Sequence, residues 1–173
     1  TGGSLGAKSI SLEVCKAICA LPVKLRKKLN IVHQVKKEFI VTIKGLYKKA
    51  QIRASLHEFI EDISIHLGAA HLVISRAGAS TIAENLISGR PAIYIPLPNS
   101  VDGHQFYNAQ YLEERGAAWL QKDEKLLSKK LLVLIKKILL SDSKLEEKSK
   151  INKAIALPNA SLELSKLVNE LVA

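Results

Sequence analysis

Methionine is absent from this 173-residue chain, and several other residue types are scarce. Aromatic residues make up only 5% of it, so few ring faces are available for stacking on nucleic-acid bases. No stretch approaches the roughly 18 consecutive apolar residues of a membrane-spanning helix, and the N-terminus lacks the charged-then-apolar order of a signal peptide. These absences predict a cytoplasmic protein. The lack of methionine predicts a fragment, or the second part of a split enzyme.

Cysteine is rare as well, with two residues in the chain. Cys15 and Cys19 are four residues apart in a segment whose apolar residues fall on one helical face, which favours buried thiols over metal ligands. No second pair of Cys or His completes a metal site, since the metal-ligand spacings are missing around His33, His57, His66, His71 and His104. We therefore expect neither a metal nor a cofactor.

Positive charge is plentiful, with a formal net charge of +10. The basic residues are scattered along the chain, and no aromatic residues are interleaved with them. This distribution favours a solvated basic surface, with attraction to an anionic inner-membrane leaflet as the functional alternative. A nucleic-acid partner is not expected.

Apolar periodicity predicts a chain in which helices and strands alternate. At this length, and with 47% hydrophobic residues, one domain covering residues 1–173 is expected. We predict strands at 30–35, 52–59, 71–75, 92–96 and 117–120. We predict helices at 7–21, 36–50, 62–70, 81–88, 104–115, 125–140 and 161–172. This alternation is typical of an α/β fold with a doubly wound parallel sheet.

A glycine-rich run, Thr1 to Lys8 (TGGSLGAK), leads into the first predicted helix. Such a run lets the backbone approach an anion and aims free N–H groups at it. It lacks the Gly-Lys-[ST] ending of a P-loop, because Ala7 stands directly before Lys8, and it lacks the spacing of GxGxxG. Taken alone, it fits phosphate or ribose binding and a tight turn equally well.

A second motif, Ser75 to Glu84 (SRAGASTIAE), follows a predicted strand and opens a helix. Its small residues permit a close turn, and the N-terminus of the helix offers unpaired N–H groups and partial positive charge, which suit a pyrophosphate. Thr81 and Glu84 also have the spacing of a capping box. On spacing alone, that structural explanation is favoured.

The third motif, Asp102 to Asn108 (DGHQFYN), places a histidine and two amides in one turn of helix. Gln105 and Asn108 lie three residues apart on the same side. Amides offer both donors and acceptors, as sugar hydroxyls require. The alternative is that Asp102 caps the helix and the amides are solvated. The two interpretations are equally supported by the residues alone.

Together, in this order and at these separations, the motifs resemble the C-terminal domain of MurG glycosyltransferases. The segments that carry the resemblance are GGSLGA, Ile31 to Gln34 (IVHQ), Glu58 to Ile63 (EFIEDI), ISRAGASTIAE and PAIYIPLPNSVDGHQFYNA. The resemblance as a whole covers nearly the entire chain. The resemblance implies a Rossmann-like C-terminal domain of a two-domain GT-B fold. It also implies that the central strand preceding Thr1 is missing, which would leave unpaired strand edges in the core.

The resemblance further implies roles for individual residues. The backbone of Ile60 would read the uracil edge, and Glu84 would accept hydrogen bonds from the ribose hydroxyls. GlcNAc hydroxyls would be held by Gln105, with Asn108 and His104 nearby. The residues around the phosphates would be Ser4, Ala79, Ser80 and Thr81, with Arg76 a motif residue beside the diphosphate.

The reaction implied is inverting transfer of GlcNAc from UDP-GlcNAc to an undecaprenyl-diphosphate-linked MurNAc-peptide in peptidoglycan synthesis. Helix N–H groups and polar side chains would stabilise the leaving UDP without a metal. In the MurG family, the general base, the acceptor site and the membrane-docking patch belong to an N-terminal domain, which we expect to be absent from this chain. We therefore expect a peripheral protein on the inner face of the cell membrane, inactive without that half.

Three alternatives remain open at this stage. The chain could be the donor-binding subunit of a split GlcNAc transferase whose acceptor half is a separate membrane chain. It could be an inactive gene remnant that binds UDP-GlcNAc weakly or not at all. A UDP-GlcNAc epimerase would share the fold, but its acid/base carboxylates have no matching motif here.

Overall fold

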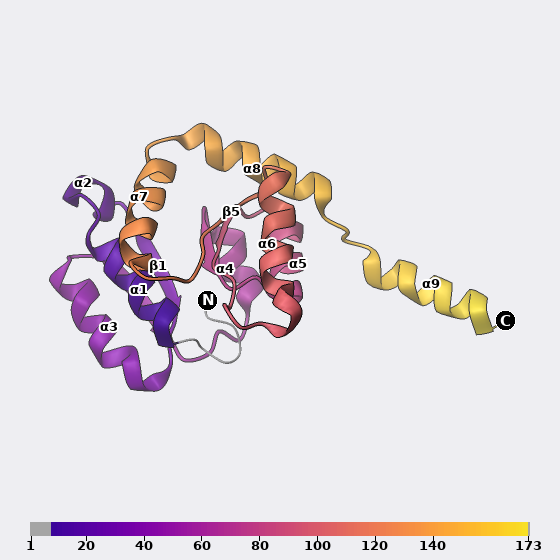
Figure 1. The fold of residues 1–173 in the computed structure, drawn as a ribbon, viewed down its shortest axis with the longest axis horizontal. Coiled ribbons are helices and arrows are strands. Elements are labelled where there is room, and N and C mark those ends of the chain that lie inside the picture. Colours follow the sequence, from indigo (N-terminus) through magenta and orange to yellow (C-terminus); the bar gives the residue numbers. More distant parts are fainter. Residues whose placement is uncertain (1–7, 173) are drawn as a thin grey trace.

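The computed structural model of this chain describes residues 8–172 (Figure 1). Its strands are β1 (Asn30–Gln34), β2 (Arg53–His57), β3 (Val73–Ser75), β4 (Ala92–Tyr94) and β5 (Ala118–Leu120). The helices preceding β4 are α1 (Lys8–Cys19), α2 (Val23–Arg26), α3 (Lys37–Lys49), α4 (Ile63–Ala69) and α5 (Ala79–Ile87). After β4 come a 3-10 turn, η1 (Val101–Gly103), and then α6 (His104–Glu114), α7 (Leu127–Leu139), α8 (Asp142–Ile155) and α9 (Ala160–Val172).

Every strand and helix predicted from periodicity is present, and no end differs from the prediction by more than two residues. Helix α7 shows why: the buried residues Leu127, Leu131, Ile135 and Ile138 form one continuous apolar stripe. Ser88 is the C-cap of α5, and the next residue, Gly89, has a φ of +63°, the left-handed conformation in which helices commonly end. Two helices, α2 and α8, were not predicted.

All strand pairs are parallel, and they form two separate sheets in the described part of the chain. One contains β1 and β2, and the other has the order β3-β4-β5. Between the two sheets lies an apolar cavity lined by β1 residues such as Ile31 and His33 and by Val73 and Ile74 of β3. Among residues 8–172, the edges of β1 and β3 that face this cavity therefore carry no paired strand.

Strand β4 lies between two layers of helices. Because successive side chains point to opposite faces of a strand, Ile93 and Ile95 pack into one buried cluster while Ala92 and Tyr94 pack into another. The first cluster contains residues of α1, α3 and α7, and the second contains residues of α6 with α5 and α8 at its margin. Helices on both faces confirm the predicted doubly wound α/β fold.

The predicted thiol burial is confirmed for Cys15, which is fully buried in the first cluster; Cys19 is half-buried, and both thiols are free. Nearby, the buried His33 ring shares a 3.0 Å hydrogen bond with the Tyr47 hydroxyl, joining β1 to α3. Burial lowers the pKa of His33 to about 4, so its ring is neutral at physiological pH.

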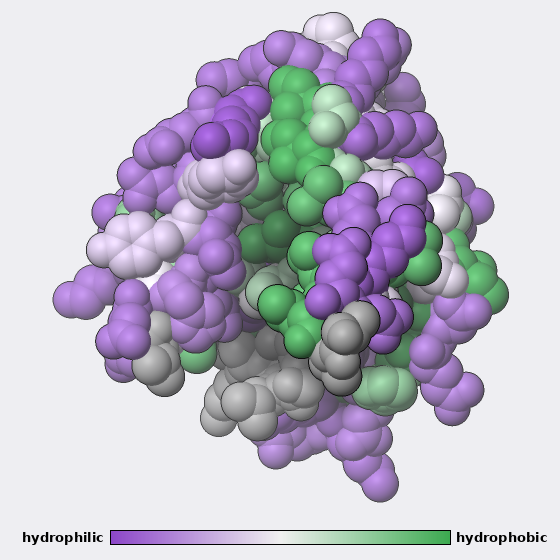
Figure 2. Space-filling model, turned by 90° about the vertical axis from the view of Figure 1, so that its right-hand side faces the viewer, coloured by the Kyte–Doolittle hydropathy of each residue, from purple (hydrophilic) through white to green (hydrophobic). Residues whose placement is uncertain are grey.

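Helix α9 extends away from the other helices and ends at the far C-terminal tip of the molecule (Figure 1). On it, Leu164, Leu167, Val168 and Leu171 are exposed and follow the i, i+3, i+4, i+7 spacing of one helical face. On the side of the molecule from which α9 projects, Figure 2 shows apolar side chains gathered in a band between hydrophilic ones. None of the helices within residues 8–172 is long and apolar enough to cross a membrane.

Candidate functional site

The sequence motifs converge where β3, β4 and β5 end. In parallel α/β sheets, ligands bind in the crevice beyond the carboxyl ends of the strands. The segment after β3 contains Arg76 and opens α5, the segment after β4 runs from Ile95 to Gly103 and opens α6, and the segment after β5 contains Asp123. Two of the three motifs therefore meet at one edge of the sheet.

Helix α5 begins at Ala79, earlier than predicted, and its N-cap is Gly78 in an extended conformation without a side-chain cap. The capping-box interpretation of Thr81 and Glu84 is therefore wrong, because both lie inside the helix. Ala79, Ser80 and Thr81 form its first turn, where backbone N–H groups have no partner within the helix. That turn combines open N–H groups with the positive end of the helix dipole.

The exposure of the α5 side chains matches a ligand-facing surface. Ala79, Ser80 and Glu84 are exposed, and Thr81 is half-buried. Glu84 lies five residues after Ala79, which is about one and a half turns along the helix. If a ligand bound at the N-terminus of α5 and extended along the helix, its polar groups would therefore lie within reach of the Glu84 carboxylate.

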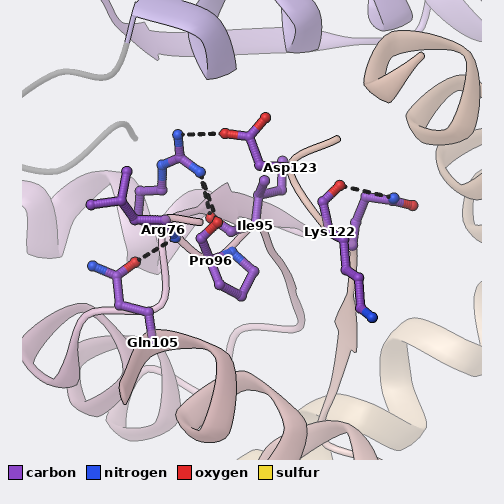
Figure 3. Close-up of polar contacts among 8 residues, drawn as sticks. Arg76, Ile95, Pro96, Gln105, Lys122 and Asp123 are labelled. Carbon is purple, nitrogen blue, oxygen red and sulfur yellow. Dashed lines mark hydrogen bonds and ion pairs between the residues drawn. The ribbon is translucent and has the colours of Figure 1, made fainter. Parts of the chain in front are cut away.

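Arg76, in the segment after β3, is buried, and its guanidinium contacts the segments that follow β4 and β5 (Figure 3). One terminal nitrogen, Nη1, donates 3.0 Å hydrogen bonds to the carbonyls of Ile95 and Pro96. The other, Nη2, donates to Oδ2 of Asp123 at 2.8 Å. Arg76 thus uses both terminal nitrogens within the protein, and its predicted contact with the diphosphate stays a prediction.

Helix α6 carries the predicted sugar-side residues. Asp102 and Gly103, just before the helix, have positive φ values of 49° and 65°. The N-cap is Gly103 and has no side-chain cap, so the alternative in which Asp102 caps this helix is wrong. His104 is exposed at the first helical position.

The two amides of α6 point back toward the ends of the strands. Gln105 accepts a 3.1 Å hydrogen bond from the N–H of Leu97 through Oε1. Asn108 donates to the carbonyl of Ala77 at 3.3 Å through Nδ2. The two side chains, predicted to bind one sugar, thus touch the loops after β4 and β3 respectively.

Ile60 lies in a different place from the other candidates. It follows β2, is half-buried, and lines the cavity between the two sheets together with Ile63 of α4. Asp62 caps α4 by accepting a 3.1 Å hydrogen bond from the Ser64 N–H. Ser4, the remaining predicted contact, lies outside the described residues.

Residues that the sequence did not single out hold α5 and Arg76 in position. Asn85, on the buried side of α5, donates a 3.1 Å hydrogen bond to the Tyr94 hydroxyl. Burial raises the pKa of Tyr94 to about 12, so the phenol stays protonated. Asp123 was missed as well, because its partner Arg76 is 47 residues away in sequence. Within residues 8–172, no group of three or more His, Cys, Asp or Glu side chains could hold a metal ion.

Known proteins resemble this chain in sequence. Residues 1–164 match the glycosyltransferase family 28 C-terminal domain. The chain belongs to this family. It is 42% identical, over 166 residues, to the UDP-N-acetylglucosamine–N-acetylmuramyl-(pentapeptide) pyrophosphoryl-undecaprenol N-acetylglucosamine transferase of Wolbachia sp. subsp. Brugia malayi, covering 96% of this chain and 48% of that protein. The protein of the same name from Caulobacter vibrioides is 35% identical over 170 residues, covering 98% of this chain and 47% of the relative.

Solved structures agree with the sequence matches. The crystal structure of MurG from Acinetobacter baumannii superposes with a TM-score of 0.88 at 32% identity, covering 98% of this chain and 48% of that one. The glycosyltransferase VinC, in complex with dTDP, shares the fold alone, with a TM-score of 0.66 at 18% identity. The family 28 chain described here therefore spans about half the length of the curated relatives it matches.

Proposed function

We propose that this chain binds UDP-GlcNAc and forms the donor half of an inverting N-acetylglucosaminyltransferase of peptidoglycan synthesis. The observation that carries the proposal is the start of α5, where Gly78 leaves the first turn without a side-chain cap directly beyond β3. A diphosphate at this turn would receive hydrogen bonds from open backbone N–H groups and favourable interaction with the helix dipole. Both MurG relatives match this chain over nearly its full length, which supports the same assignment.

The nucleotide end of the donor would lie along α5. The N–H groups and hydroxyls of Ala79, Ser80 and Thr81 would surround the phosphates, and the exposed carboxylate of Glu84 would accept hydrogen bonds from the ribose hydroxyls. Ser4 would complete the phosphate contacts, and the backbone of Ile60 would read the uracil edge. Charge that develops on the leaving UDP would be stabilised by the helix terminus.

The sugar end would lie against α6. Oε1 of Gln105 accepts a hydrogen bond from the Leu97 N–H, so the Nε2 group would be free to donate to a GlcNAc hydroxyl. Asn108 donates through Nδ2 to Ala77, so its Oδ1 would accept from a second hydroxyl. His104 would border the sugar from the first turn of the helix.

The acceptor would be the lipid-linked MurNAc-peptide. We propose that the acceptor site and the general base lie in the half of the related proteins that this chain does not match. The net charge of +10 would favour approach to an anionic inner-membrane surface, where the lipid carrier lies. The chain would act there as a peripheral protein.

Titration with paired nucleotide sugars tests the donor assignment. UDP-GlcNAc and UDP-glucose differ only in the acetamido group, so a GlcNAc site should bind the first more tightly. We expect saturable binding of UDP-GlcNAc that UDP-glucose competes with weakly. Equal affinity for both sugars would argue for a general UDP-sugar site, and absence of binding by folded protein would favour an inactive remnant.

A further inference from the structure

The ion pair between Arg76 and Asp123 differs from the others in the described part of the chain because it is buried. The side chains of Arg76 and Asp123 are 7% and 14% exposed, whereas those of the Lys130–Glu124 pair are 48% and 46% exposed. The free-energy cost of desolvating two charges offsets much of their electrostatic attraction, so a buried ion pair is weak evidence for stability. Its placement at the ends of three strands calls for another explanation.

Three consecutive residues of the segment after β4 are held by side-chain hydrogen bonds. The carbonyls of Ile95 and Pro96 both accept from Arg76, and the N–H of Leu97 donates to Gln105 (Figure 3). Arg76 therefore fixes one side of this segment, and Gln105, the predicted sugar contact, is fixed to the other. A shift of the Arg76 guanidinium would move the backbone that orients the Gln105 amide.

Asp123 sets the position of that guanidinium. Its carboxylate accepts from Nη2 while both bonds to the carbonyls come from Nη1, so the planar fork is oriented from two directions. Arg76 Nε is buried without a hydrogen-bond partner among residues 8–172. The guanidinium is thus oriented toward the carbonyls and Asp123 even though one N–H goes unsatisfied.

Helix α5 beyond its first turn is held by different contacts. Asn85 anchors the helix to β4 through the Tyr94 hydroxyl, and Ile82 and Leu86 pack against the second buried cluster. None of these contacts involves the guanidinium of Arg76 or the carboxylate of Asp123. Helix α5 therefore has packing contacts of its own that do not depend on the ion pair, although Asn108 of α6 also donates to the Ala77 carbonyl just before this helix.

We propose that the Arg76–Asp123 ion pair is a positioning device for the sugar end of the donor, acting through residues 95–97 on Gln105. This inference rests on the proposed function, because it presumes that Gln105 faces the sugar of a nucleotide sugar. The pair affects the affinity for the sugar part of UDP-GlcNAc, and it leaves the affinity for the nucleotide part, UDP, unchanged. In this proposal Arg76 and Asp123 are positioning residues, and this role replaces the direct contact of Arg76 with the diphosphate that the family resemblance implies.

The test compares Asp123→Asn with Asp123→Glu and the matched control Glu124→Gln. Each protein is titrated with UDP and with UDP-GlcNAc. For Asp123→Asn, we expect UDP affinity within about twofold of wild type and UDP-GlcNAc affinity lower by about tenfold, the typical effect of weakening one charge-assisted hydrogen bond. Asp123→Glu should recover part of the loss, and Glu124→Gln should behave as wild type because its partner Lys130 is exposed.

Equal losses for UDP and UDP-GlcNAc, or no loss for either, would overturn the positioning role. Amide hydrogen exchange without any ligand gives a second readout. In Asp123→Asn, the amides of residues 95–105 should exchange faster, while those of residues 82–87 keep their wild-type rates. Unchanged exchange at 95–105 would overturn the inference by itself, whereas a wild-type chain that binds UDP but shows no preference for UDP-GlcNAc would instead count against the proposed function.

Discussion

Asn85 and Tyr94 form a buried hydrogen bond of 3.1 Å that fastens α5 to β4. The two residues are 1% and 2% exposed, so neither polar group has water as an alternative partner. In Tyr94→Phe, the Asn85 amide would lose its acceptor and stay buried, which typically costs about 1–3 kcal/mol. We expect a loss of this size in the free energy of unfolding, measured by urea denaturation. The control is Tyr111→Phe. Because Tyr111 is 48% exposed, removal of its hydroxyl should change the free energy of unfolding little.

Two glycines give opposite predictions for the same substitution. Gly89 has a φ of +63°, and a Cβ there would lie 2.7 Å from Cε of Lys153. Gly89→Ala should therefore lower the free energy of unfolding by about 1–2 kcal/mol, chiefly through the left-handed backbone. Gly45, inside α3, has open space around it, so Gly45→Ala should raise stability by about 0.5–1 kcal/mol. Thermal unfolding of both variants checks the pair, and a stabilising Gly89→Ala would contradict the C-cap geometry.

His33 makes stability depend on pH. Burial lowers its folded-state pKa to about 4, whereas an unfolded histidine titrates near 6.5. Between these values the unfolded chain binds the extra proton, so stability falls as pH drops. From pH 7 to pH 5, this group should remove about 2 kcal/mol from the free energy of unfolding.

The check is denaturant unfolding at pH 7 and pH 5. His33→Gln, which cannot titrate, should lose that part of the pH dependence even if its stability at pH 7 is lower. His71→Gln is the matched control because His71 is exposed. A pH dependence that disappears in the His71 variant, or persists undiminished in the His33 variant, would show that another group is responsible.

Turnover should require more than this chain. Because the chain spans about half the length of its curated relatives, we expect no GlcNAc transfer to a lipid-linked acceptor by the purified protein alone. Adding the other half of a relative should restore transfer. Sustained turnover by the chain alone would place the acceptor site and the general base within these residues.

Features that neighbouring residues encode could be predicted from the sequence, whereas features that depend on distant contacts could not. Helix α7 was predicted because its apolar stripe repeats along the helix. Helix α8 was missed because most of its residues are polar; its anchors include the buried Asn152, which donates to the Arg90 carbonyl at 2.8 Å, and Lys148, which reaches the carbonyls of Gly116 and Ala118. Such contacts to distant backbone leave no periodic signal in the sequence.

The candidate site shows the same division. The motif around Ser75–Glu84 could be placed at a strand-to-helix junction because glycine, small residues and the following apolar spacing are neighbours in the chain. The spacing of Thr81 and Glu84 suggested a cap, and only the observed start of α5 at Ala79 excluded it. The link between Arg76 and Asp123 joins the ends of β3 and β5, so it depends on the order of strands in the sheet.

The central claim is that α5 holds the nucleotide of UDP-GlcNAc, and calorimetric titration of Glu84→Ala tests it most directly. The matched control is Glu170→Ala, which removes an exposed helical glutamate on α9. Hydrogen bonds to a charged group are typically worth about 1.5–3 kcal/mol, so affinity for UDP-GlcNAc should fall by about tenfold or more in Glu84→Ala and stay at the wild-type value in the control. Wild-type affinity in a folded Glu84→Ala protein would contradict the claim.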